Sequence, residues 1–88
     1  SNSTLHVRDV YPNPANSEAV FEYEFFDAGL AAKISLHNIL GTEFNAYTLD
    51  PGHRKLKIRT DHLSPGIYFY TLYINNENLV TRKLVVKR

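Results

Sequence analysis

Apolar and polar residues alternate along most of this chain with the period of two that is typical of β-strands. In Phe21-Glu22-Tyr23-Glu24-Phe25, three aromatic residues fall on one face and two glutamates on the other, as in a half-buried antiparallel strand. Gly, Pro, Asn and Asp separate the alternating segments, and no segment keeps a helical period over more than about one turn. The pattern predicts seven strands, at residues 5–10, 19–26, 32–39, 43–49, 54–60, 67–74 and 80–87.

Turn signals separate these strands at regular intervals. Tyr11-Pro12-Asn13-Pro14 ends the first strand, because proline donates no backbone hydrogen bond to a ladder. Asp50-Pro51-Gly52 is a strong turn signal, and a further turn at Asn75-Asn76-Glu77-Asn78 joins the last two strands. Short strands with turns every 8–12 residues or so favour an all-β fold, a seven-stranded immunoglobulin-like antiparallel β-sandwich. A small antiparallel barrel is the alternative architecture.

Tyr68 stands at the start of the predicted sixth strand, just after Gly66, where immunoglobulin-like domains have a tyrosine corner. In that motif the tyrosine hydroxyl bonds to the backbone a few residues upstream. Tyr70 occupies the position that is Cys in antibody domains, and its ring would fill the space between the two sheets. We therefore expect the rings of Phe21, Tyr23, Tyr68 and Tyr70 to form the core.

Length and composition limit the classes of protein that the chain can belong to. Its 88 residues allow one domain, which we assign to residues 5–88, with residues 1–4 as an expression remnant or linker. A net charge of +1 gives no overall field for nucleic acid. The absence of Cys excludes disulfides and thiolate metal sites. No apolar run approaches the roughly 20 residues of a membrane span, so no integral membrane segment is expected.

The chain shows no constellation of residues that indicates catalysis. None of its Ser residues lies in a Gly-x-Ser-x-Gly elbow, and Glu22 and Glu24 fit a solvated strand face better than a glycosidase pair. The spacing of the histidines favours exposed residues over a metal site, although sandwich loops could still assemble a calcium site from distant segments. We expect no enzyme activity, cofactor or metal. The histidines are His6, His37, His53 and His62.

Two surface features each allow two interpretations. The basic run at residues 54–59 could bind anions or nucleic acid, but Glu22 and Glu24 would face it across paired strands. Cross-strand pairs of opposite charge contribute roughly 0.2–1 kcal/mol each, and we favour that explanation. Phe69 and Tyr73 would point outward from the sixth strand. They could form a partner or glycan surface, or be covered by the first strand or by loops.

Four segments together resemble the C-terminal sorting domain of cargo proteins of the type IX secretion system (the Por secretion system) of Bacteroidetes-type Gram-negative bacteria. They are Tyr11-Pro12-Asn13-Pro14-Ala15, residues 34–41 (Ile-Ser-Leu-His-Asn-Ile-Leu-Gly), residues 63–72 (Leu-Ser-Pro-Gly-Ile-Tyr-Phe-Tyr-Thr-Leu) and residues 83–87 (Lys-Leu-Val-Val-Lys). The resemblance extends from about residue 5 to residue 88. It implies a seven-stranded sandwich that directs a larger, upstream cargo domain across the outer membrane.

The resemblance also implies partners and a location. The translocon or a shuttle protein would recognise the folded domain, and a sortase-like peptidase would remove it, with cleavage near or before Leu5. The cargo would pass through the periplasm to the cell surface or the medium. A final strand would offer an edge to a receptor, kept soluble by Lys83, Lys87 and Arg88, and an exposed edge strand would also allow a weak homodimer.

Carried over position by position, the resemblance assigns recognition to eleven residues. They are Pro12, Asn13, Pro14, Gly41, Gly66, Tyr68, Lys83, Leu84, Val85, Val86 and Lys87. The chain departs from the family pattern around Gly41, where Asn38 and Thr42 stand in place of the common Asp and Arg, and no role is carried over to those two positions.

Two functions of other classes remain as alternatives. The first is a fibronectin-like or carbohydrate-binding accessory module of a secreted enzyme or adhesin, for which the outward Phe69 and Tyr73 would be the natural platform. The second is a structural spacer that supports a neighbouring domain.

Overall fold

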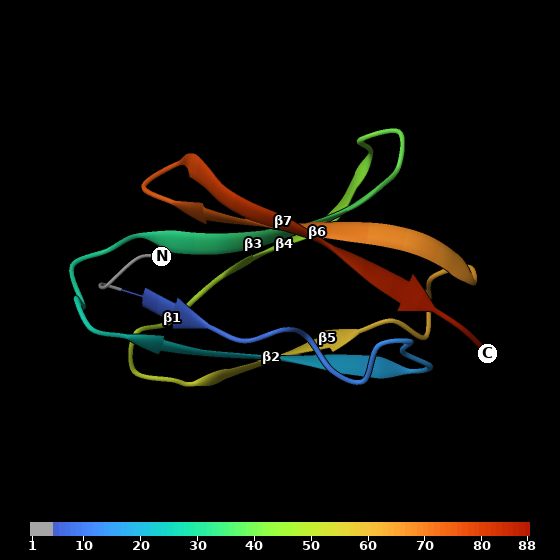
Figure 1. Cartoon of the computed structure of the whole chain (residues 1–88), viewed down its shortest axis with the longest axis horizontal. Coiled ribbons are helices and arrows are strands. Elements are labelled where there is room, and N and C mark those ends of the chain that lie inside the picture. Colours follow the sequence, from blue (N-terminus) through green and yellow to red (C-terminus); the bar gives the residue numbers. More distant parts are fainter. Residues whose placement is uncertain (1–4) are drawn as a thin grey trace.

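The computed structural model describes residues 5–88, which form seven strands in two sheets and no helix (Figure 1). The predicted immunoglobulin-like sandwich is confirmed, and the barrel alternative is wrong because the two sheets stay separate, in the orders β1-β2-β5 and β4-β3-β6-β7. The interpretation of residues 1–4 lies outside the described residues. The strands are β1 (Leu5–Val7), β2 (Glu18–Phe25), β3 (Ala32–Asn38), β4 (Glu43–Thr48), β5 (Lys55–Arg59), β6 (Gly66–Ile74) and β7 (Glu77–Val86).

Aromatic rings from both sheets fill the space between them, as the alternation predicts. Phe21 on β2 and Tyr70 on β6 are almost fully buried, and their rings meet edge to face with centroids 5.9 Å apart. The Tyr23 hydroxyl donates to the backbone oxygen of Asp50 at 3.0 Å, and the Tyr70 hydroxyl accepts from the backbone N–H of Val10 at 3.3 Å. Buried tyrosines therefore supply apolar area while their polar ends remain bonded.

The tyrosine corner is also present. Tyr68 is 7% exposed, and its hydroxyl donates to the backbone oxygen of Ser64 at 2.6 Å. This bond ties the start of β6 to the loop that arrives from β5, in the other sheet. The corner therefore fixes where the chain enters the second sheet, at the start of β6 and beside β7.

The last hairpin is tighter than the sequence predicts. Asn75 and Asn76 have φ angles of 51° and 68°, so the turn needs only two residues and β7 begins at Glu77 instead of Val80. Asn tolerates this left-handed region better than most residues, and two such residues in succession are typical of a type I′ hairpin turn. A bulge follows, in which Leu72 pairs with Val80 and Tyr73 with Asn78.

Candidate functional site

The segments that contain the residues assigned to recognition come from distant parts of the chain and lie toward one end of the sandwich (Figure 1). There Gly66 pairs with Val86, and Asn38, which precedes the β3–β4 turn, pairs with Tyr68. We call this end the C-terminal pole and define it as segment 11–16, the turn at residues 39–42, the start of β6 and the last residues of β7. The fold thus brings together four motifs that the sequence can place only in order.

Segment 11–16 lies along the outer edge of β7 and is bonded to it. The Asn13 side chain donates from Nδ2 to the backbone oxygen of Lys83 at 3.0 Å and accepts at Oδ1 from the backbone N–H of Val85 at 2.9 Å. Ala15 donates its N–H to the Val85 oxygen at 2.7 Å and accepts from the Lys87 N–H at 2.8 Å. Because the flanking prolines have no N–H, the Asn13 amide supplies a hydrogen-bond donor that their backbone cannot.

The expectation of a free edge on the last strand is therefore wrong for its final residues. Backbone groups of Lys83, Val85 and Lys87 already have partners in segment 11–16. Just before them, the Arg82 guanidinium pairs with the Asp9 carboxylate at 2.7 Å. The chain leaves β1 and crosses to the other sheet before β2 begins, and this crossing covers the edge of β7.

Arg88 also has a different role from the one expected. Its guanidinium donates to four backbone oxygens, those of Asn16 at 2.7 Å, Thr60 at 2.9 Å, Asp61 at 3.0 Å and Leu63 at 2.6 Å. The side chain is thus a bridge between two loops and the end of β7, not a free cation that keeps an edge soluble. No sequence signal could show this, because every acceptor is a backbone carbonyl.

The assigned residues fall into three groups by burial. Tyr68, Leu84 and Val86 belong to the core, at 7%, 0% and 2% exposure. Val85 is half-buried. The remaining seven are exposed and accessible to a partner: Pro12, Asn13, Pro14, Gly41, Gly66, Lys83 and Lys87.

The β3–β4 turn is organised by the side chain of Asn38. Its Oδ1 accepts from the N–H groups of Leu40 at 3.0 Å and Thr42 at 2.9 Å, while Gly41 donates its N–H to the Asn38 backbone oxygen at 3.0 Å. Gly41 has a φ of +89°, which an L-residue rarely adopts. An Asp at this position would supply the same accepting oxygen. The turn holds Ile39 and Leu40 at 74% and 88% exposure.

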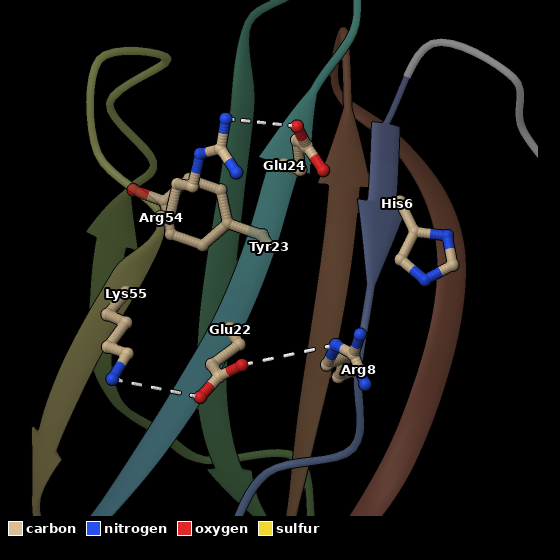
Figure 2. Close-up of a pocket in the computed structure, with 7 residues that line it drawn as sticks. All are labelled: His6, Arg8, Glu22, Tyr23, Glu24, Arg54 and Lys55. Carbon is tan, nitrogen blue, oxygen red and sulfur yellow. Dashed lines mark ion pairs between the residues drawn. The ribbon is translucent and has the colours of Figure 1, made fainter.

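The outer face of β2 and β5 carries a shallow depression of about 250 Å³, lined by His6, Arg8, Glu22, Tyr23, Glu24, Arg54 and Lys55 (Figure 2). Arg54 pairs with Glu24 at 3.1 Å, and Glu22 lies between Lys55 at 3.9 Å and Arg8 at 4.0 Å. The expected cross-strand ion pairs are confirmed, with Glu22 directly opposite Lys55. The basic run is therefore matched by carboxylates.

The outward aromatic rings are covered by side chains of β3. The His37 ring stacks on Phe69 with centroids 6.1 Å apart, and the Lys33 ammonium lies 5.4 Å from the centre of the Tyr73 ring. Both aromatic residues are half-buried. A glycan platform needs free ring faces, so this arrangement does not favour the carbohydrate-binding alternative.

Two further observations concern residues 5–88. Within this range no three His, Cys, Asp or Glu side chains lie close enough to hold a metal ion together. The same residues include no helix of the length and apolar character that a membrane crossing requires.

Comparison with known proteins identifies a family and a similar fold. A family model described as "Secretion system C-terminal sorting domain" matches residues 9–87. The crystal structure of dimeric latent PorU from Porphyromonas gingivalis is similar to 93% of this chain, with a TM-score of 0.75 and 17% identity, which shows a common fold. This chain covers 9% of that PorU chain. No curated protein matches.

Proposed function

The chain belongs to the family of secretion-system C-terminal sorting domains, and on that premise we propose how it acts. It is a sorting signal of the type IX secretion system, which directs a larger cargo protein toward the cell surface or the extracellular space. We propose that the cargo waits in the periplasm until a translocon or shuttle protein binds the folded domain. A sortase-like peptidase then cuts near or before Leu5, so the cargo lies upstream.

The observation that carries this proposal is the convergence of the family's motifs at the C-terminal pole. Asn13, near one end of the described chain, bonds to Lys83 and Val85 near the other. A receptor at this pole would contact residues from all four motifs only when the sandwich is folded. The signal is therefore the folded surface of the pole. The core residues Tyr68, Leu84 and Val86 stabilise this surface, and its exposed residues contact the receptor.

A reporter fusion tests the proposal. Residues 1–88, preceded by a native linker, are joined to a fluorescent protein in a host with a working type IX system. We expect reporter at the cell surface or in the medium. Reporter that stays in the periplasm, from a domain shown to be folded, would contradict the function.

A matched pair of variants tests the role of the pole. Lys83→Ala with Lys87→Ala removes two exposed lysines from the pole, and we expect slower export. Lys55→Ala with Lys57→Ala removes two lysines that are 68% and 62% exposed on the other sheet. If both double variants are exported equally well, the two pole lysines are not part of the recognised surface.

A further inference from the structure

Ile39 and Leu40 are the most exposed large apolar residues among those described, at 74% and 88%. A loose loop could fold such side chains against the protein, but four hydrogen bonds to the backbone and side chain of Asn38 fix this turn. The Asn38 N–H donates to the Thr42 oxygen at 3.0 Å, and the Gly41 N–H donates to the Asn38 backbone oxygen at 3.0 Å. The N–H groups of Leu40 and Thr42 donate to Asn38 Oδ1. Two adjacent aliphatic side chains that an ordered turn holds in water form an apolar surface that a partner can cover.

The strand that follows this turn, β4, is an open sheet edge. At the opposite edge of the same sheet, β7 is covered by Asn13 and Ala15 over its last residues. In the other sheet, the edge strand β5 carries Lys55, Lys57 and Arg59, and such cations discourage edge pairing. β4 has one charged residue, Glu43, and no proline.

The hydrogen-bonding groups on this edge can be assigned. Leu49 donates its N–H to the Ala32 oxygen at 2.9 Å, so it faces β3. Residues 45–48 pair with residues 36–33 of β3 without interruption. Because successive residues of an antiparallel strand face alternate sides, the N–H groups of Ala46 and Thr48 point away from β3, toward open solvent.

We propose that the β3–β4 turn and the open edge of β4 form a docking surface for an extended segment of a secretion-machinery protein. The segment adds a strand beside β4, accepts hydrogen bonds from Ala46 and Thr48, and covers Ile39 and Leu40 with apolar side chains. Main-chain bonds then supply affinity and the aliphatic pair supplies specificity. This inference rests on the proposed sorting function and identifies one contact within it.

The charges near the turn favour a protein over a membrane. Residues 38–48 carry a single charged side chain, the Glu43 carboxylate, and it would be repelled by an anionic lipid surface. Peripheral membrane segments normally combine apolar residues with Lys or Arg. A lipid surface would also leave the N–H groups of the β4 edge without partners.

The geometry also disfavours a second copy of this chain as the occupant. Two β4 strands paired about a two-fold axis at Ala46 would place each turn beside the end of the other β4. At that point, after Thr48, the chain leaves for β5 in the other sheet. Ile39 and Leu40 would stay uncovered. A partner strand that extends past Glu43 covers both.

Site-specific photo-crosslinking identifies the occupant. The photoreactive residue p-benzoylphenylalanine replaces Leu40 in the reporter fusion, and cells are irradiated during export. We expect an adduct with an outer-membrane protein of the type IX machinery, at about tenfold the yield of the same probe at Leu79, which is 44% exposed on β7. An adduct between two cargo copies, an adduct with lipid alone, or equal yields at both positions would overturn the docking surface.

Export of variants provides a second, independent readout. Ile39→Ser with Leu40→Ser should lower exported reporter about tenfold and leave the melting temperature unchanged, because both side chains are exposed. Ala46→Pro should lower export by removing one outward N–H, provided that its melting temperature shows a folded domain. Leu79→Ser is the control.

The unmutated fusion distinguishes failure of the docking surface from failure of the sorting function. If the unmutated fusion is not exported, the sorting function fails. If it is exported and the serine variant is exported equally, only the docking surface fails.

Discussion

The side-chain oxygen of Asn13 accepts a hydrogen bond at 2.9 Å from the backbone N–H of Val85, which lies 72 positions further along the chain. Together with the bond from the Asn13 amide to Lys83, it joins the Pro-Asn-Pro motif to the final strand. The two motifs are therefore one structural unit, and a change in either alters the surface that both present.

Asn13→Ala should destabilise the domain by about 1–2 kcal/mol, because it removes two hydrogen bonds to backbone groups of β7. Asn13→Asp keeps the acceptor for Val85, so its free energy of unfolding should lie between those of the original chain and of Asn13→Ala. Urea unfolding measures the difference. Asn16→Ala is the control, since Asn16 contributes its backbone oxygen to the Arg88 contact. Equal stabilities for the two alanine variants would contradict the Asn13 bridge.

Arg88→Ala should lower the free energy of unfolding by about 1–2 kcal/mol, because four backbone oxygens lose a guanidinium donor. For a domain of this size that corresponds to a fall of roughly 4–16 °C in melting temperature. Arg88→Lys should recover little, since an ammonium cannot reproduce the planar fork of donors. Lys87→Ala, at an exposed neighbour, should change stability by less than about 0.5 kcal/mol. A fully stable Arg88→Lys variant would show that charge alone suffices.

Tyr68→Phe removes the hydroxyl that donates to the Ser64 oxygen at 2.6 Å and leaves the ring in the core. We expect a loss of about 1 kcal/mol in thermal or chemical unfolding. Tyr73→Phe, on the outer face of the same strand, is the matched control and should be close to neutral. If Tyr68→Phe and Tyr73→Phe lower the free energy of unfolding equally, the bond from Tyr68 to Ser64 does not stabilise the fold.

Asp61 gives the stability a defined pH dependence. Its hydrogen bond to Arg59, with a smaller coulombic contribution from the same residue, lowers the pKa of the carboxyl below its ordinary value. The folded state therefore binds a proton less readily than the unfolded chain. This contribution is complete above the ordinary carboxyl pKa, about 4, and is lost as the pH falls through the lowered value.

Asp61→Asn should therefore reduce stability at pH 7 and remove this part of the acid dependence. Melting temperatures measured between about pH 7 and pH 2 test it. Arg59→Gln should flatten the curve in the same way, because the guanidinium is the main cause of the shift. Parallel curves for the original chain and for Asp61→Asn would contradict this assignment.

Local patterns in the sequence were sufficient to predict seven strands and their inner faces, although the first strand ends at Val7 and the last begins at Glu77, earlier in each case than predicted. The period of two in β2 assigns Phe21 and Tyr23 to the core and Glu22 and Glu24 to the solvent, since side chains of a strand alternate between its faces. Asp50-Pro51-Gly52 predicts a turn, and there the Asp50 carboxylate accepts from the Gly52 N–H at 2.8 Å. Such features depend only on neighbours in the chain.

Tertiary structure alone decided which edges are open and where the motifs meet. Segment 11–16 covers β7 and Arg88 bridges two loops through bonds to backbone groups, which every residue possesses and no side-chain pattern reveals. The pairing of Asn13 with Val85 likewise depends on where the chain crosses between sheets. Alternation and turn residues determine each strand, but contacts between distant backbones exist only after the two sheets have packed together.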